Sequence, residues 1–214
     1  MAFLLGWSRT SLGGPILVLD QSDTVNSSGE YLGGGTGIKA IAQTFTPAIS
    51  GQLAVLNLLL NNNGSGNDPL VASIYDTQNG LPNNLLGTED LYNISGQYFA
   101  WYSMDFTNLA INLNANTLYA FVFTHPTGGY IYMRGTVLDS YPRGMELVQT
   151  SSNPSWQPDT RSPDMCFETY MIVPEPTVVT LIVSGLSCFV LLGVSRCPST
   201  RASYGRWAGR GRTR

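Results

Sequence analysis

The sequence is poor in the residues that most often carry chemistry: its 214 residues include one histidine, three cysteines and a single lysine. His125 lies among turn residues, and neither a G-x-S-x-G segment nor a comparable cysteine context accompanies it, so no hydrolase triad is expected. A second histidine or a cluster of cysteines, which a zinc-type centre requires, is missing from the sequence as well. We therefore expect a protein that is not an enzyme, with His125 as a loop residue without a catalytic role.

Cysteine usage excludes a disulfide framework. Cys166 is the only cysteine of residues 1–176, whereas Cys188 and Cys197 lie within or just after a C-terminal apolar run. A lone cysteine cannot form a bridge inside this part of the chain, and the spacing typical of metal ligands does not occur. Cys166 is expected to be a small core residue.

Positive charge is scarce everywhere except at the C-terminus. Residues 1–176 hold five basic residues against fourteen acidic ones, a net charge of −9, whereas residues 177–214 hold six arginines and no acidic residue. An acidic body that is almost free of lysine cannot bind nucleic acid through its phosphates. The sequence therefore predicts no nucleic-acid partner.

The longest apolar run is C-terminal. Residues 177–194 contain 18 residues without a charge, about the minimum length that crosses a bilayer core as a helix. The tail 195–214 follows, and its arginines begin with Arg196, Arg201 and Arg206. Clustered arginines stay on the cytoplasmic side of a membrane, so the body is expected on the far side. One interpretation is an ordinary C-terminal anchor behind a proline-rich linker.

A short motif precedes this run and favours a more specific interpretation. Pro174, Glu175 and Pro176 form an extended segment because neither proline permits a helix there. The order of motif, apolar helix and basic tail over residues 174–214 resembles the PEP-CTERM sorting signal of Gram-negative bacteria. The resemblance implies recognition at Pro174–Pro176 by exosortase, a membrane protease-transpeptidase. It also implies a transient stay in the inner membrane, followed by transfer to the cell surface or the extracellular matrix.

The N-terminal segment, residues 1–36, is interpreted as a leader. Residues 1–7 form a very short apolar stretch followed by Arg9, which makes a poor signal peptide and suggests that the true start lies upstream. Residues 20–37 are rich in Ser, Gly and Asn and are expected to be mobile.

Residues 37–173 read as one β-domain. Short apolar or alternating segments are separated by turn residues, and no segment outside the apolar run shows a convincing helical period. The expected strands fall within residues 41–47, 52–60, 70–76, 101–106, 118–124, 130–134 and 164–173. Gln78-Asn79-Gly80 and Pro82 predict a turn after 70–76. Residues 101–106 alternate strictly, with Trp101, Ser103 and Asp105 on one side of the strand. This pattern predicts an all-β, antiparallel sandwich, with the jelly-roll type preferred.

Several loose motifs in this region occur in a familiar order. They are Gln43–Pro47 (QTFTP), the Ile74-Tyr75-Asp76 and Asn79–Pro82 segments, Leu113 with Thr117–Tyr119, and Trp156 followed by Asp164, Phe167 and Tyr170. Over residues 40–172 the chain thereby resembles the choice-of-anchor group of exported bacterial β-domains. The resemblance implies a surface-exposed sandwich and no catalytic residues.

Aromatic residues beside loops are candidates for stacking on sugars. Trp156, Tyr130 and Tyr132 are the main candidates, with Tyr141 as a further one. The alternative is that these rings pack in the core or cover its ends.

Acidic residues are candidates for glycosidase carboxylates and for calcium ligands. Glu89 and Asp90 are adjacent, while Asp159, Asp164 and Glu168 lie around the last strand, and neither set has a spacing that defines a catalytic pair. The loop with Asn61, Asn63, Ser65 and Gly66 imitates the start of an EF-hand, but Ala72 stands where the bidentate glutamate is required. No cofactor or metal site is expected, and a structural calcium ion is kept only as an alternative.

Together these observations predict an exported bacterial protein of the cell surface or extracellular matrix, with a non-catalytic structural or adhesive β-sandwich. A carbohydrate-binding module acting on extracellular polysaccharide is the first alternative, and a glycan hydrolase is the second.

Overall fold

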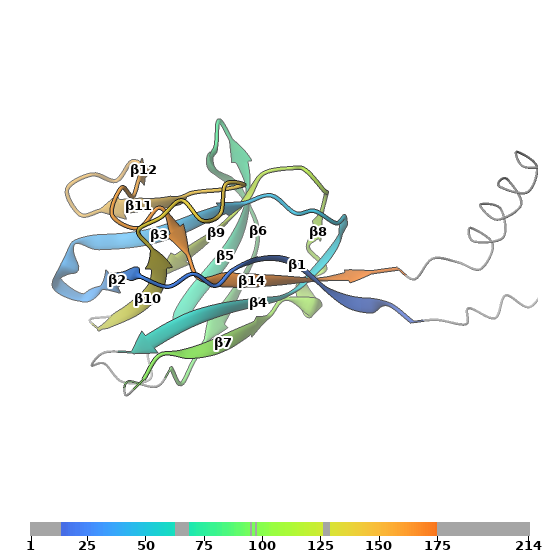
Figure 1. The fold of residues 1–214 in the computed structure, drawn as a ribbon, viewed down its shortest axis with the longest axis horizontal. Helices are drawn as coiled ribbons and strands as arrows, with labels where there is room; N and C mark the ends of the chain where they lie inside the picture. Colours follow the sequence, from blue (N-terminus) through green and yellow to red (C-terminus); the bar gives the residue numbers. More distant parts are fainter. Residues whose placement is uncertain (1–13, 63–68, 95, 97, 126–128, 175–214) are drawn as a thin grey trace, which may run out of the picture. The chain divides into compact units, whose positions relative to one another are not determined.

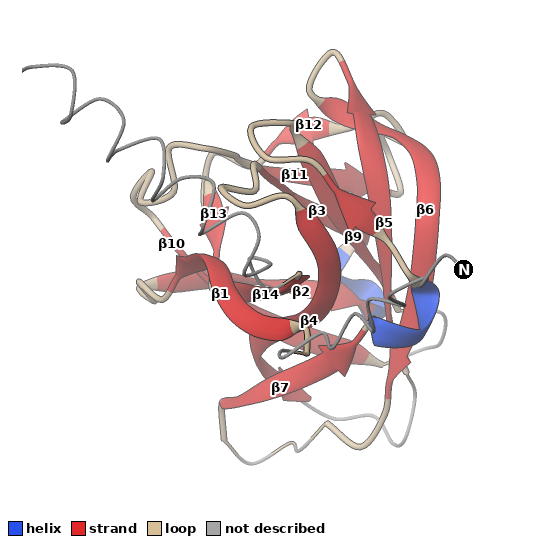
Figure 2. Ribbon diagram, turned by 90° about the vertical axis from the view of Figure 1, so that its right-hand side faces the viewer, coloured by secondary structure: helices blue, strands red, loops and turns tan. Residues whose placement is uncertain are grey.

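The computed structural model describes residues 14–62, 69–94, 96, 98–125 and 129–174, which belong to the compact unit Leu12–Glu175. Two antiparallel sheets face each other across one core, and the only helices of this part of the chain are two single 3-10 turns, η1 (Gly34–Thr36) and η2 (Thr107–Leu109) (Figures 1 and 2). The prediction of an all-β, antiparallel fold is therefore confirmed. No helix in the described part of the chain is long and apolar enough to cross a membrane, and the run 177–194 lies outside it.

Eight strands form the first sheet, which we call sheet A. They are β1 (Ile16–Asp23), β2 (Ser28–Gly33), β4 (Gly51–Asn62), β7 (Ala100–Asp105), β8 (Asn112–Leu113), β10 (Tyr130–Thr136), β13 (Asp164–Met165) and β14 (Phe167–Val173). The long strand β4 is central: β14 pairs with residues 52–58 of it and β10 with residues 60–62. β1 lies beyond β14, β2 lies beyond β10, and β7 pairs with β4 as well.

Six strands form sheet B, in the order β12 (Gln157–Pro158), β11 (Glu146–Thr150), β3 (Ile38–Phe45), β9 (Tyr119–Thr124), β5 (Leu70–Gln78) and β6 (Leu81–Leu91). Asn79 and Gly80 join β5 to β6, both with positive φ (55° and 79°). Such a pair fits the two-residue turn that matches the twist of an antiparallel hairpin, so the turn expected here is present.

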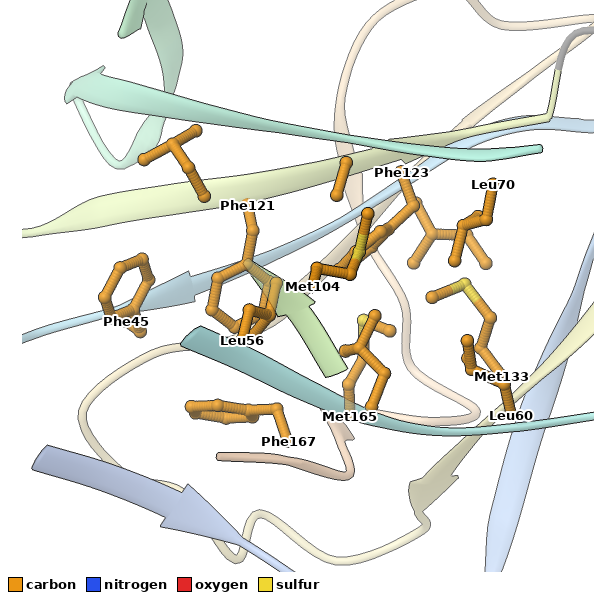
Figure 3. Packing of buried hydrophobic residues seen from close by; sticks show 14 of the residues in the cluster. Phe45, Leu56, Leu60, Leu70, Met104, Phe121, Phe123, Met133, Met165 and Phe167 are labelled. Atoms are coloured by element: carbon orange, nitrogen blue, oxygen red, sulfur yellow. The ribbon is translucent and has the colours of Figure 1, made fainter. Parts of the chain in front are cut away.

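Aromatic rings fill the space between the sheets (Figure 3). Phe121 of β9 is fully buried, and its ring centroid lies 4.8 Å from that of Phe45, 5.0 Å from that of Phe167 and 5.6 Å from that of Phe123. Phe167 comes from sheet A and the other three rings come from sheet B. Every second residue of the paired strands points into this core, and the residues between them point outward.

The two ends of sheet A have different contents. At one end β1 begins and β14 finishes side by side, with Ile16 opposite Val173 (Figure 1). We call this the terminal end. At the other end, the distal end, β4 finishes between β10 and β7, and β2 flanks β10.

The start of the sandwich has to be corrected. Residue 37 was expected as its boundary, but β1 and β2 lie within residues 1–36 and complete one side of sheet A. The second half of β1 is polar at every position, so the alternation of apolar and polar residues that identifies a strand in a sequence is absent there. Its buried Gln21 accepts a hydrogen bond from the Tyr141 hydroxyl (2.8 Å), and its buried Asp23 accepts one from Ser140. These partners exist only in the folded domain.

Candidate functional site

Aromatic side chains gather on the outer face of sheet A at its distal end. Tyr31 of β2 lies opposite Tyr132 of β10, which lies opposite Asn61 of β4. Trp101 of β7 lies opposite Leu59, the next outward residue of β4. The residues between these positions point into the core, so four strands deliver their outward side chains to one surface.

Ring contacts join four aromatic residues of this surface, and Trp101 lies on the same face without a ring contact to them among the described residues. The rings of Tyr31 and Tyr132 stack at 4.2 Å and 15°, Tyr130 meets Tyr31 edge to face at 5.3 Å, and Phe99 meets Tyr132 at 5.2 Å and 62°. We call Tyr31, Phe99, Trp101, Tyr130 and Tyr132 the aromatic shelf. Tyr31 is 38% exposed and Trp101 43% exposed, whereas the other three are half-buried. Because mutual stacking closes one face of Tyr31 and of Tyr132, the exposed indole of Trp101 is the larger surface for a ligand.

A glycine in β2, Gly29, lies beneath the shelf where there is no room for a side chain. A side chain at Gly29 would collide with the carbonyl oxygen of Met133 and would lie 3.0 Å from the ring of Tyr132. Glycine at this position therefore lets β2 approach β10 closely enough for Tyr31 and Tyr132 to stack.

Arg134 places a positive charge at the shelf. Its guanidinium carbon lies 4.2 Å from the ring centroid of Phe99 and 5.7 Å from that of Tyr132. Nη1 donates a long hydrogen bond of 3.5 Å to the carbonyl oxygen of Ser28. Both ion pairs found among the described residues belong to Arg161, so most of the guanidinium donors of Arg134 are not committed to a carboxylate. A fork of N–H donors beside aromatic rings is suited to the hydroxyl or carboxyl groups of a ligand.

A chain of hydrogen bonds crosses the same face beside the shelf. Ser103 donates to Oδ1 of Asn57 (2.7 Å), and Nδ2 of Asn57 donates to Oε2 of Glu168 (2.9 Å). The Tyr170 hydroxyl donates to the same carboxylate oxygen (3.0 Å), and this bond raises the pKa of Tyr170. The side chains that border the shelf are thus held in fixed positions.

The structure divides the predicted stacking residues. Tyr130 and Tyr132 belong to the shelf, but Trp156 lies on sheet B, where it packs with Tyr75 against a small cluster of buried residues. Tyr141 is buried against Phe167, and this burial raises its pKa to about 12. Sequence reasoning missed Tyr31, Phe99 and Trp101. The alternation of residues 101–106 placed Trp101 on the polar side of its strand, and that pattern could have identified it.

Of the predicted sorting motif, Pro174–Pro176, the structure describes only the first residue. Pro174 is exposed and follows β14 directly. Glu175, Pro176, Arg196, Arg201 and Arg206 lie outside the described residues.

A buried group of carboxyl side chains lies between the sheets and was not expected from the sequence. Glu146 is 2% exposed and its Oε1 has no hydrogen-bond partner, while Asp159 and Glu30 share Arg161 at 2.9 and 3.2 Å. Burial, then the nearby carboxylates of Asp159 and Glu30, raises the pKa of Glu146 well above its ordinary value. Because these acids are enclosed and Arg161 neutralises two of them, we assign the group a structural role.

The two other side chains considered for chemistry, Cys166 and His125, are both buried. Cys166 is buried, as predicted, and its thiol donates to the carbonyl oxygen of Val25 (3.0 Å), while burial raises its pKa to about 12. His125 directly follows β9, outside any strand, and its side chain is buried beside Gly33. Among the described residues, no three His, Cys, Asp or Glu side chains are arranged to hold a metal ion.

The predicted acidic and calcium candidates are dispersed. Asp164 accepts hydrogen bonds from the Tyr141 backbone (2.9 Å) and from Gln43 (3.3 Å), while Glu168 belongs to the outer face described above. Asn61 lies beneath the shelf, nearly buried, whereas Asn63, Ser65 and Gly66 lie outside the described residues.

Comparison with known protein families, with curated proteins and with solved structures finds no match for this chain.

Proposed function

We propose that the protein is an exported bacterial protein, sorted through a PEP-CTERM signal, whose sandwich binds extracellular polysaccharide without catalysing a reaction. The observation that carries this proposal is the aromatic shelf on an open sheet face. A soluble domain ordinarily buries rings such as Trp101, and a group of exposed rings beside fixed polar side chains marks a binding surface.

Sugars match this combination of groups. The C–H face of a pyranose packs on an aromatic ring, and its hydroxyls require donors and acceptors at the rim of the contact. Trp101 supplies the ring, and Asn57, Ser103, Glu168 and Arg134 supply the polar groups.

The fold is consistent with the jelly-roll type preferred from the sequence. The ladder β1–β14–β4–β7 in one sheet and the ladder β3–β9–β5–β6 in the other follow the strand order of a jelly roll. The strands β10–β13 then form an insertion between β9 and β14. This topology supports the likeness to exported choice-of-anchor domains.

Sorting is supported by the position of the motif. β14 ends at Val173 and Pro174 follows at once, so the folded domain stops where the motif begins. The apolar run 177–194 and the arginines behind it supply the stop-transfer segment. The protein is placed transiently in the inner membrane and afterwards at the cell surface or in the matrix, with exosortase and polysaccharide as its partners.

Substitution of Trp101 by alanine tests the binding surface. We expect the affinity for the organism's extracellular polysaccharide to fall by about 2 kcal/mol, roughly thirtyfold in Kd, as for loss of a central aromatic anchor. Affinity electrophoresis or a glycan array gives the comparison. Trp156→Ala is the matched control, because this tryptophan packs on sheet B. Equal losses in both variants, or no binding by the unchanged protein to any polysaccharide, would contradict the proposal.

Substitution of Glu175 by alanine tests the sorting signal. We expect the full-length chain to accumulate in the inner-membrane fraction, because the motif presented to exosortase is damaged while the helix is intact. Intact-mass measurement of the membrane and medium fractions reports the outcome. Glu89→Ala, a change on the edge strand β6, is the control and should be shortened normally. Release of shortened Glu175→Ala protein would show that this signal is not used.

A further inference from the structure

An exposed apolar surface lies at the terminal end of sheet A. Ile16, Leu17 and Leu19 of β1 are 43%, 57% and 47% exposed. Leu17 lies opposite Ile172 of β14, which points to the same outer face. We call Leu17, Leu19 and Ile172 the β1 patch; Ile16 lies opposite Val173, which packs against the core, and so belongs to the other face. Natural edge strands usually carry charges or prolines, because an apolar edge invites unwanted pairing, so this composition calls for a partner.

The length of the chain brings one particular partner close. β14 ends at Val173, and the apolar run begins at residue 177. Four extended steps of at most about 3.6 Å separate these positions, a span of roughly 14 Å. The sequence of this segment disfavours a helix because it contains two prolines. While the run occupies the membrane, the terminal end of the sandwich is therefore held beside the lipid headgroups.

We propose that the β1 patch rests on the lipid surface of the membrane while the precursor awaits processing. This inference depends on the proposed sorting function, since it is the C-terminal helix that brings the patch to the membrane. Leucine and isoleucine side chains partition into the boundary between headgroups and acyl chains.

Apolar contact, not charge, drives this interaction. β1 carries no basic residue that would attract anionic lipid, and the carboxylate of Asp20 accepts hydrogen bonds from the backbone of Ala48 and Ile49, both at 2.9 Å. The contact is therefore expected to be insensitive to salt and to the content of anionic lipid.

The contact would orient the domain. Ile172 lies opposite Gln52 of β4, and Tyr132 of the aromatic shelf lies opposite Asn61, nine residues further along the strand. At about 3.3 Å per residue the shelf is roughly 30 Å from the β1 patch. Resting on the patch thus holds the Pro174 segment at the membrane surface, where a membrane protease acts, and the shelf lies at the opposite end of the sheet, roughly 30 Å along the strands.

Fluorescence quenching in vesicles tests the contact. The full-length chain carrying Leu17→Trp is reconstituted into phosphatidylethanolamine–phosphatidylglycerol vesicles with brominated acyl chains, and the wild-type signal is subtracted. Leu85→Trp is the matched control, because Leu85 is 55% exposed but lies on β6 of sheet B. We expect the fluorescence added at position 17 to be quenched several-fold more strongly than that added at position 85, in low and in high salt.

Processing gives a second measurement. Leu17→Ser combined with Leu19→Ser should slow the shortening of the precursor several-fold, whereas Leu85→Ser combined with Leu86→Ser should not. Resistance to an alkaline carbonate wash reports separately whether the C-terminal helix is inserted. If the helix is inserted but position 17 is quenched no more than position 85, the membrane contact is refuted. The β1 patch would then be covered by something other than lipid, such as the residues before β1 or a second copy of the chain. If the chain washes off the vesicles, the sorting proposal fails and this inference fails with it.

Discussion

Replacement of Glu146 by glutamine is expected to stabilise the domain at pH 8 by on the order of 1.4 kcal/mol, the free energy of one pH unit of proton linkage. In the wild-type protein Glu146 is enclosed between the sheets, Oε1 has no hydrogen-bond partner, and the pKa is raised by burial and by the carboxylates of Asp159 and Glu30. Glutamine has nearly the same shape and is neutral at every pH, so it removes the free-energy cost of keeping the buried carboxyl protonated when the unfolded chain would be ionised.

The pH dependence of the free energy of unfolding shows whether the raised pKa of Glu146 causes the stabilisation. A raised pKa means that the folded protein keeps this proton where the unfolded chain has lost it, so the free energy of unfolding falls as the pH rises above the ordinary value of 4.5. One such group contributes at most about 1.4 kcal/mol per pH unit. The pKa values of Glu30 and Asp164 are also raised, chiefly by burial, and act with the same sign. Urea unfolding between pH 5 and 9 should therefore show a shallower decline for Glu146→Gln than for the wild type.

Asp76 provides a comparison of opposite sign. Hydrogen bonds from Asn84 lower the pKa of this exposed carboxylate, so its contribution to stability is lost as the pH falls through its folded pKa. Asp76→Asn should lower the free energy of unfolding at pH values above this range, and the stabilities of the variant and the wild type should converge in acid.

An unchanged pH slope in Glu146→Gln would show that Glu146 does not carry a buried proton.

Truncation of Phe121 to alanine is expected to lower the free energy of unfolding by about 3–5 kcal/mol. This ring contacts three other phenylalanines and joins sheet B to Phe167 of sheet A, so its loss leaves a cavity at the centre of the sandwich (Figure 3). A domain of this size is stable by only about 5–15 kcal/mol in total, so the variant should unfold at a much lower urea concentration.

Tyr98→Ala is the matched control for this substitution. Tyr98 is 76% exposed, and its truncation should change stability by less than about 0.5 kcal/mol. A loss below about 1 kcal/mol in Phe121→Ala would mean that the two sheets do not pack through this ring, since even small core truncations cost that much.

The β1 patch and the aromatic shelf occupy opposite ends of sheet A, which bears on the proposed precursor. The β1 patch and the sorting motif share one end of the sheet, and the aromatic shelf lies at the other end. Under the proposed sorting and binding functions, a domain held at its terminal end has its proposed polysaccharide-binding face at the opposite end of the sheet, before and after processing.

Local chemistry along the chain was sufficient for the class of fold. Period-two alternation at residues 101–106, the Asn79-Gly80 turn and the lone Cys166 each predicted what the structure contains, because strand alternation, turn geometry and burial of a small apolar thiol depend on neighbouring residues. The partition of residues 177–194 into lipid is a prediction of the same local kind and lies outside the described residues.

The aromatic shelf and the carboxyl group around Glu146 required the folded domain. Tyr31, Trp101 and Tyr132 come from three strands far apart in the sequence, and their meeting depends on the register of those strands. Register is set by the burial of both sheets together, since a slip of one residue would turn each outward ring into the core. The same dependence explains why β1 and β2 read as a leader: their polar inward residues become favourable only when Tyr141, Ser140 and β10 are already in place.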